Sequence, residues 1–196
     1  MERKKKIMDL LEEAVANIGF LRKQETIDTI DEIAELLIAA LRNNNRIYFC
    51  GNGGSAADCQ HLAAEFVGRF QKERAGLPAV SLTTDTSILT AVGNDYGFKY
   101  IFSRQLEALA RKGDVLFLLS TSGKSDNVIT AALESRRNGL KVIALTGGDG
   151  GELIKFSDLS LIAPGKNTAR IQETHIMVGH ILVEIAEEEL NADAES

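Results

Sequence analysis

Apolar residues recur every three or four positions through the first 43 residues, which is the spacing of one face of an α-helix. One series runs from Ile7 to Leu21 and a second from Ile27 to Leu41. Polar residues at positions 23–25 separate the two series. The pattern predicts two N-terminal helices that form a helical hairpin.

The hydrophobic pattern changes after residue 43, where short apolar runs alternate with amphipathic segments. The runs predict strands at residues 46–50, 79–82, 115–120, 141–146 and 159–163, and the segments around them predict helices at 55–70, 97–111, 125–138 and 169–190. Nearly continuous apolar strands that alternate with helices are typical of a parallel sheet covered on both faces. We expect a single α/β domain over residues 1–196, with the helical pair in residues 1–43 and a five-stranded parallel sheet flanked by helices in residues 44–196.

The composition is that of an ordinary globular protein, with 44% hydrophobic and 26% charged residues. A net charge of −6 argues against a nucleic-acid surface, so an anionic substrate must be held by local groups. Cys50 and Cys59 form no CxxC pair, which argues against a disulfide framework or a zinc knuckle. No stretch approaches the ~20 apolar residues of a membrane span. We therefore expect a cytoplasmic protein that binds neither nucleic acid nor membrane.

Two loops rich in glycine and hydroxyl groups follow predicted strands, and open parallel sheets bind ligands at the carboxyl ends of their strands. The first loop is GNGGS at residues 51–55, and the second is STSGKS at residues 120–125. Glycine lets the backbone turn sharply toward a ligand, and the free amide groups of the following helix attract an anion. Both loops lack the dinucleotide and Walker A spacings, so a small phosphorylated molecule is the expected ligand. The alternative is that Ser125 only caps a helix and the other hydroxyls only stabilise turns.

A second group of residues suits a metal ion or a proton transfer. His61 and Glu65 share one helix face because they lie four positions apart. The last predicted helix carries Gln172, His175 and His180. Imidazole, carboxylate and amide oxygen together suit zinc or a similar divalent ion.

These residues also have structural explanations, and their spacing limits a shared metal site. Glu65 could form an ion pair with Arg69, and either histidine of the last helix could lie in an interface. Gln172 and His180 are eight residues apart, which separates them by ~12 Å along a continuous helix. One ion can contact both only if Gln172 precedes the regular helix, or if the two residues come from different subunits.

Six segments of the chain carry a specific resemblance: GNGGS, QHLAAEFVGRF, VGNDYGF, STSGKSDNVI, LTGGDGGEL and ARIQETHIMVGHILVE. In this order, over nearly all of the chain from Asn45 onward, the sequence resembles the phosphoheptose isomerases, a family with the SIS (sugar isomerase) fold. The resemblance implies an aldose–ketose isomerase that converts D-sedoheptulose 7-phosphate into D-glycero-D-manno-heptose 7-phosphate through an enediol. That reaction is the first step toward ADP-heptose and the heptose of lipopolysaccharide or related glycans. The resemblance also implies a cytoplasmic homotetramer with active sites at subunit interfaces and one zinc ion per subunit.

The resemblance assigns roles to individual residues. The implied substrate contacts are Asn52, Gly53, Gly54, Ser55, Glu65, Asn94, Asp95, Ser120, Thr121, Ser122, Ser125 and Gln172. The implied zinc ligands are His61, Glu65, Gln172 and His180. Glu65 and His180 are also the implied catalytic residues, with Glu65 removing the carbon-bound proton and His180 moving the hydroxyl proton.

Two positions depart from the family pattern, and two other functions remain open. Lys124 stands where a neutral polar residue is expected, and Ala169 stands where some members carry an acidic residue. One alternative is a non-catalytic SIS protein that binds a replication initiator or another regulatory partner. The relative of that kind lacks the residues corresponding to Glu65 and His180, so their presence favours an enzyme. The other alternative is an isomerase of a different sugar phosphate, such as an arabinose or hexulose phosphate.

Overall fold

The centre of the molecule is a sheet of five parallel strands in the order β2-β1-β3-β4-β5. The structure is a computed structural model that describes the backbone of residues 1–194 and the side chains of residues 1–192. The strands are β1 (Ile47–Gly51), β2 (Ala79–Ser81), β3 (Val115–Ser120), β4 (Lys141–Gly147) and β5 (Leu159–Ala163). The predicted five-stranded parallel sheet is confirmed, and two of its strands have the predicted bounds.

Helices cover both faces of this sheet. They are α1 (Glu2–Leu21), α2 (Gln24–Arg42), α3 (Gly54–Val67), α4 (Thr86–Asp95), α5 (Ser103–Leu109), α6 (Asp126–Arg137) and α7 (Thr168–Ala194). Two 3₁₀ turns, η1 (Phe98–Tyr100) and η2 (Leu153–Phe156), complete the elements. No helix in the described residues is both long and apolar enough to cross a bilayer.

Successive strand residues face opposite layers, as the pleat of a strand requires. Phe49 and Phe117 pack with each other at 5.4 Å between ring centroids, in the core beneath α2, α3 and α7. Their neighbours Tyr48 and Leu116 face the second core, beneath α5 and α6. Both faces of β1 and β3 are buried, so these strands are nearly continuous apolar runs, and the fold is a three-layer α/β/α sandwich.

The strand order reverses direction next to β1. After β1 the chain passes through α3 to β2 on one side, and then returns through α4 and α5 to β3 on the other side. The carboxyl ends of β1 and β3 therefore meet at the topological switch point, where open α/β sheets form their ligand crevice. Both predicted phosphate loops begin at this point.

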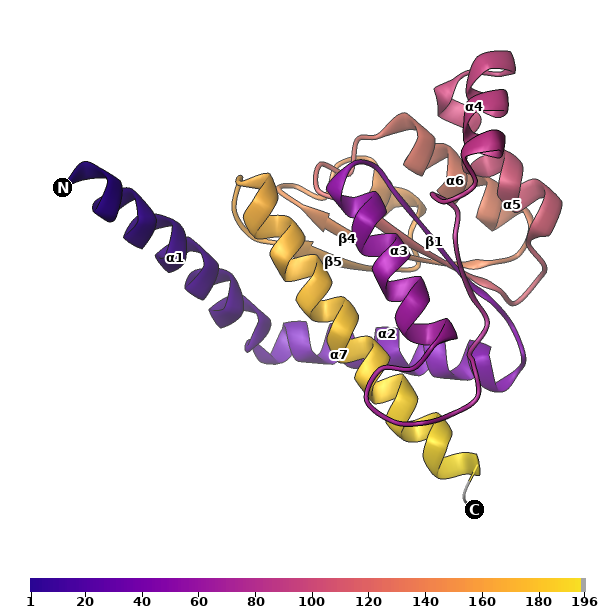
Figure 1. The fold of residues 1–196 in the computed structure, drawn as a ribbon, viewed down its shortest axis with the longest axis horizontal. Coiled ribbons are helices and arrows are strands. Elements are labelled where there is room, and N and C mark those ends of the chain that lie inside the picture. Colours follow the sequence, from indigo (N-terminus) through magenta and orange to yellow (C-terminus); the bar gives the residue numbers. More distant parts are fainter. Residues whose placement is uncertain (195–196) are drawn as a thin grey trace.

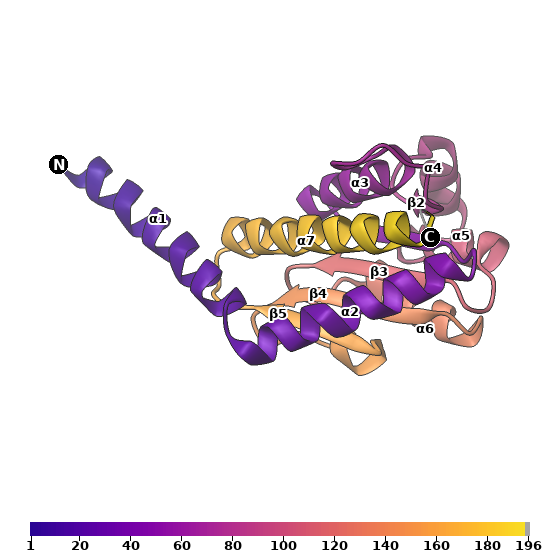
Figure 2. The same cartoon turned by 90° about the horizontal axis from the view of Figure 1, so that it is seen from below.

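The predicted N-terminal pair of helices is present, and its two members differ in their surroundings. Helix α2 packs against α7 and β5, whereas α1 extends away from the rest of the molecule (Figure 1, Figure 2). Only Asn17 and Leu21 of α1 are buried. Asn17 donates hydrogen bonds to the backbone oxygen of Arg170 (3.2 Å) and to Thr174 Oγ1 (3.1 Å), which joins the end of α1 to α7.

The region between β2 and β3 differs most from the sequence prediction. The helix expected over 97–111 is wrong at its start, because Gly97 has φ +99° and a helical path begins only with η1 and α5. The sequence analysis also missed α4. Its signal was Asp85, whose carboxylate accepts a hydrogen bond from the backbone N–H of Ile88 (2.9 Å) and so caps the helix.

Candidate active site

The two predicted phosphate loops form one cavity at the switch point. The cavity has a volume of about 290 Å³. It is lined by Asn52, Gly53, Gly54, Ser55, Leu119, Ser120, Thr121, Ser122, Ser125, Thr168 and Gln172. Nine of these eleven residues were predicted to contact substrate, and they come from three separate segments of the chain. Leu119 and Thr168 were not predicted; Thr168 begins α7 and could have been found from its place before Gln172.

Two helices direct their N-termini toward this cavity. Helix α3 follows Gly53, which has φ +55°, and α6 follows Ser125. Gly53 has no side chain, and the side chain of Ser125 makes no capping hydrogen bond, so neither cap residue occupies the first amide groups of α3 and α6 through a side chain. The alternative that Ser125 serves as a side-chain cap is therefore not what the structure contains. Two uncapped helix N-termini favour an anion such as a phosphate group.

A reciprocal amide pair holds the two loops together. Asn52 Nδ2 donates to Asn127 Oδ1, and Asn127 Nδ2 donates to Asn52 Oδ1, each at 2.8 Å. Asn127, near the start of α6, is 2% exposed. The sequence analysis missed Asn127, because nothing in its local sequence indicates a partner 75 residues away.

Lys124 lies beside the cavity without lining it. Its Nζ is 3.4 Å from Asp149 Oδ2 in the neighbouring TGGDGG loop, and both side chains are largely exposed. The hydrogen bond that Asp149 accepts from Gly151, followed by the charge of Lys124, lowers the pKa of the Asp149 carboxyl. The positive charge of Lys124 is therefore shared with a carboxylate.

His61, Glu65 and His180 form a second cluster, farther along α3 and α7. The Nε2 atoms of His61 and His180 are 2.9 Å apart, and His61 Nε2 is 3.6 Å from Glu65 Oε1. The ring of His180 also stacks on Phe70, with 5.8 Å between centroids. Two imidazoles and a carboxylate in this arrangement can exchange protons, and they are donor types that zinc accepts.

Asp58 lies one turn before His61 on α3 and faces the same cluster. Burial raises the pKa of the Asp58 carboxyl, and the nearby His61 and His180 oppose that rise. Asp58 Oδ2 is buried and has no hydrogen-bond partner among the described residues.

Gln172 is separate from this cluster. It lies within α7, which is continuous from Thr168 to Ala194, so the possibility that it precedes the regular helix is excluded. Its side-chain amide lies against the backbone of Gly54, where an added Cβ would approach Gln172 Nε2 to 2.5 Å. Gln172 therefore belongs to the phosphate cavity, ~12 Å along the helix axis from His180.

One chain does not assemble the four predicted zinc ligands. In the part of the chain that the structure describes, no three His, Cys, Asp or Glu side chains surround a common point suited to a metal ion. The cluster brings together imidazole and carboxylate groups, two of the three predicted donor types, and Gln172 of the same chain lies apart from it.

Asn94 and Asp95 are also apart from the cavity. They end α4, where Asn94 Nδ2 donates to Asp95 Oδ1 at 2.8 Å, and both are exposed. Neither lines the cavity formed by the two loops. Within one chain, the structure does not unite these two predicted substrate contacts with the others.

His175 has a structural environment that differs from that of the other two histidines. It is fully buried, and its Nε2 lies 2.9 Å from the backbone oxygen of Thr146. Since a carbonyl only accepts, Nε2 carries the hydrogen, and Nδ1 is left without a partner among the described residues. Burial lowers the pKa of His175 to about 4, so the ring is neutral.

Comparisons with known proteins agree with the resemblance seen in the sequence. The family model of the SIS domain matches residues 11–147. The phosphoheptose isomerase of a Nitratiruptor species is 56% identical over 153 residues, which cover 78% of this chain and 82% of that relative.

Solved structures give the same result. The phosphoheptose isomerase from Neisseria gonorrhoeae superimposes with a TM-score of 0.89 at 43% identity, covering 94% of this chain and 98% of that chain. The phosphoheptose isomerase from Francisella tularensis superimposes with a TM-score of 0.92 at 36% identity, covering 96% of this chain and all of that chain (100%). The chain therefore belongs to the phosphoheptose isomerase family of SIS-domain enzymes, which are aldose–ketose isomerases that act on sugar phosphates.

Proposed function

We propose that this enzyme converts D-sedoheptulose 7-phosphate into D-glycero-D-manno-heptose 7-phosphate, as the first step toward ADP-heptose. The observation that carries the proposal is the cavity at which the N-termini of α3 and α6 converge, an arrangement that suits a phosphate group. All the predicted substrate contacts in the 52–55 and 120–125 segments line this cavity. Gly123 and Lys124 were not among the predicted contacts and do not line it. The names of the relatives support the choice of a heptose phosphate.

In this proposal the proton transfers belong to the cluster on α3 and α7. Glu65 removes the proton from the carbon next to the carbonyl, and His180 moves the hydroxyl proton as the enediol forms and collapses. The short contact between His180 and His61 keeps the ring of His180 in place for this transfer. General acid–base catalysis by such groups typically contributes a hundredfold to ten-thousandfold in rate, roughly.

The axial distance between the two parts favours a site shared by two subunits. Glu65 lies eleven residues after Gly54, or ~16 Å along α3. One substrate molecule would have to reach across this span if both parts came from one chain. We therefore propose that the phosphate cavity of one subunit works with Glu65 and His180 of another, in a homotetramer. The cytoplasmic location stays a prediction.

We also propose one zinc ion per subunit, held by His61, Glu65 and His180, with Gln172 supplied by the neighbouring subunit. When bound, zinc would polarise the substrate carbonyl. The donor types of the cluster support this assignment, and the distance of Gln172 from the cluster is the reason for invoking a second subunit.

The first experiment compares turnover of sedoheptulose 7-phosphate by wild type, Glu65→Gln and Glu73→Gln. Glu73 is the matched control, because it is an exposed carboxylate a few residues beyond the same helix. We expect Glu65→Gln to bind the substrate and to lose at least about a hundredfold in kcat, while Glu73→Gln keeps its activity. A folded wild type that is inactive on this sugar and active on another sugar phosphate would contradict the substrate assignment. Inactivity on all of them would instead favour the partner-binding alternative.

The shared site has its own test in mixed oligomers. Ser122→Asp places a carboxylate in the phosphate cavity, so we expect it to be inactive alone, as is Glu65→Gln. If sites are shared, mixed oligomers of the two variants regain activity, because some sites combine an intact cavity with an intact Glu65. Mixtures that stay inactive, although mass spectrometry detects mixed oligomers, would place the whole site in one chain.

A further inference from the structure

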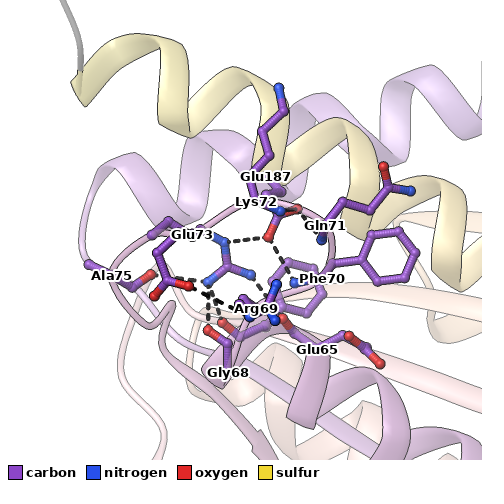
Figure 3. A network of polar contacts seen from close by, with 11 residues as sticks. Glu65, Gly68, Arg69, Phe70, Gln71, Lys72, Glu73, Ala75 and Glu187 are labelled. Atoms are coloured by element: carbon purple, nitrogen blue, oxygen red, sulfur yellow. Dashed lines mark hydrogen bonds and ion pairs between the residues drawn. The ribbon is translucent and has the colours of Figure 1, made fainter.

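A buried carboxylate on α7 organises the segment that follows α3. Glu187 is 1% exposed at its side chain. It accepts hydrogen bonds from three successive backbone N–H groups, those of Phe70 (2.8 Å), Gln71 (2.6 Å) and Lys72 (2.8 Å) (Figure 3). Burial opposes ionisation of Glu187, but these hydrogen bonds outweigh it, and the pKa of the carboxyl lies below its ordinary value. The charged form of Glu187 thus folds the segment against α7.

Arg74 joins this carboxylate to the end of α3. Its Nε lies 3.0 Å from Glu187 Oε1 in an ion pair, although Nε makes no hydrogen bond there. The other guanidinium nitrogens donate to the backbone oxygens of Glu65 (2.8 Å), Phe66 (2.9 Å) and Ala75 (3.0 Å). Carbonyl groups in the last turn of a helix have no partner within the helix, so Arg74 supplies the missing donors for α3.

The same pair is connected to both proposed catalytic residues. Arg74 binds the main chain of Glu65 directly, and Figure 3 shows the Glu65 side chain directed away from the ion pair. The segment held by Glu187 places the ring of Phe70 on His180, at 5.8 Å between centroids and 25° between planes. Glu187 follows His180 by seven residues on α7, and therefore lies on the same face of that helix.

We propose that Arg74 and Glu187 are positioning residues, which together fix Glu65 and His180 relative to each other for proton transfer. This inference rests on the proposed function. The relative placement matters because a shift of about 1 Å in a reacting group can cost about a hundredfold in rate. The phosphate cavity lies at the opposite end of α3 and α7, so the pair acts on the chemical step and not on the binding of the phosphate.

The first test is the nearly isosteric variant Glu187→Gln, which removes the charge and one set of acceptor lone pairs. We expect kcat to fall at least about tenfold, with KM within about threefold of wild type because the phosphate cavity is intact. Asp114→Asn is the matched control. Asp114 is 2% exposed and accepts hydrogen bonds from the backbone N–H groups of Arg46 and Arg111, each at 2.8 Å. It precedes β3 and therefore lies at the amino ends of the strands, whereas the cavity lies at their carboxyl ends.

Both variants are compared at a temperature at which urea titration shows each to be folded. A loss of kcat in Glu187→Gln without a similar loss in Asp114→Asn supports the positioning role. Equal losses of kcat in the two variants, or an unchanged kcat in Glu187→Gln, would show that Arg74 and Glu187 have only a structural role and would overturn the proposal. If Glu187→Gln does not fold, Phe70→Leu replaces it, because this change leaves the ion pair and the three N–H groups in place and removes only the ring beside His180. An unchanged kcat in Phe70→Leu would then overturn the proposal.

A second readout does not need activity. The chain has three histidines, so the imidazole proton resonances of a histidine-labelled sample can be assigned by single substitutions. We expect the resonance of His180 to move in Glu187→Gln, in the direction seen for Phe70→Leu, and to stay in place in Asp114→Asn. If the His180 resonance shifts in Glu187→Gln but the wild type has no activity on sedoheptulose 7-phosphate, the proposed function is contradicted and the positioning of His180 is supported. A fixed resonance in an active enzyme would contradict the positioning and keep the function.

Discussion

The phosphate cavity and the His61–Glu65–His180 cluster use the same two helices in different ways. The cavity lies at the N-termini of α3 and α7 and at the loop before α6, and residues of one chain line it. The cluster lies in the later part of α3 and the middle of α7, and in the described residues no three His, Cys, Asp or Glu side chains surround a point suited to a metal ion. Backbone amides at helix starts are thus placed by local folding, whereas a cluster of side chains from two helices depends on how those helices pack.

The difference follows from what determines the positions of the functional groups in each of the two places. In the cavity, the direction of the amide groups is set by backbone angles at glycine, such as φ +60° at Gly123. In the cluster, the distance between imidazoles is set by how closely α3 and α7 approach. They approach closely at Gly179, where an added Cβ would lie 2.6 Å from a methyl carbon of Leu62. The following predictions test these two kinds of control.

The largest effect is expected for Gly123→Ala, which changes the loop beside the cavity and not the cluster on α3 and α7. Gly123 has φ +60°, and an added Cβ would lie 2.0 Å from the backbone oxygen of Gly150. Because backbone must move on both sides, we expect the free energy of unfolding to fall by more than about 4 kcal/mol. In the protein that remains folded, we expect affinity for inorganic phosphate, measured by calorimetry, to fall at least about a hundredfold, since several amide donors are displaced at once.

Gly148→Ala is the matched control for this prediction. Gly148 has a similar φ of +63°, but an added Cβ would meet no atom within 4 Å. Gly148→Ala should therefore lower the free energy of unfolding by about 1–2 kcal/mol, which is the cost of placing alanine in a left-handed conformation. Equal losses of stability in the two variants would mean that the close approach of Gly123 to the backbone of Gly150 does not matter.

The second-largest effect concerns His175, which is buried against the backbone of Thr146 in β4, in contrast to the exposed His61. Its pKa of about 4 in the folded state is below the ordinary value of 6.5, so the unfolded chain binds more protons between these two values. Stability is therefore full above pH 6.5 and is lost as the pH falls. We expect a loss of about 2 kcal/mol between pH 7 and pH 5, and about 3 kcal/mol by pH 4. Urea titrations at these pH values measure it.

The variant His175→Leu distinguishes the contribution of this histidine to the pH dependence of stability from the contribution of the carboxylates. Glu187 has a lowered pKa, so it contributes to pH dependence only below the ordinary carboxyl range. Between pH 7 and pH 5, the loss of stability should therefore be much smaller in His175→Leu than in wild type. An unchanged pH dependence in the variant would show that His175 is not its source.

Much of the fold could be predicted from the sequence because its strands are buried on both faces. Residues 115–120 are apolar up to the final Ser120, and residues 159–163 contain a single polar residue, Ser160, so the bounds of both runs were predicted correctly. The segment 86–95 was missed because α4 has no fully buried residue among those described, which weakens its apolar periodicity. The predicted end of α3 at residue 70 was three residues late, because Glu187 draws the N–H groups of residues 70–72 out of the helix.

The candidate site could be predicted where it is local and could not where it depends on distant contacts. The two loops are recognisable by the glycine and hydroxyl residues that each contains within six positions. The separation of Gln172 from His180 followed from helix geometry alone. Contacts such as Arg74 with Glu187, or Asn52 with Asn127, join residues that are far apart in the chain and carry no local signal.

The smallest effect tests whether the cavity is already assembled before a ligand arrives. Asn52 and Asn127 satisfy each other with two hydrogen bonds of 2.8 Å, and Asn127 Oδ1 also accepts the backbone N–H of Val128 at 3.0 Å. In a double-mutant cycle with Asn52→Ala and Asn127→Ala, we expect a coupling of about 1–2 kcal/mol in the free energy of unfolding. Asn52→Ala with Asn138→Ala, at the other end of α6, should be additive within about 0.5 kcal/mol. If the first pair is also additive, the loops are held independently, and the cavity would need its ligand to bring them together.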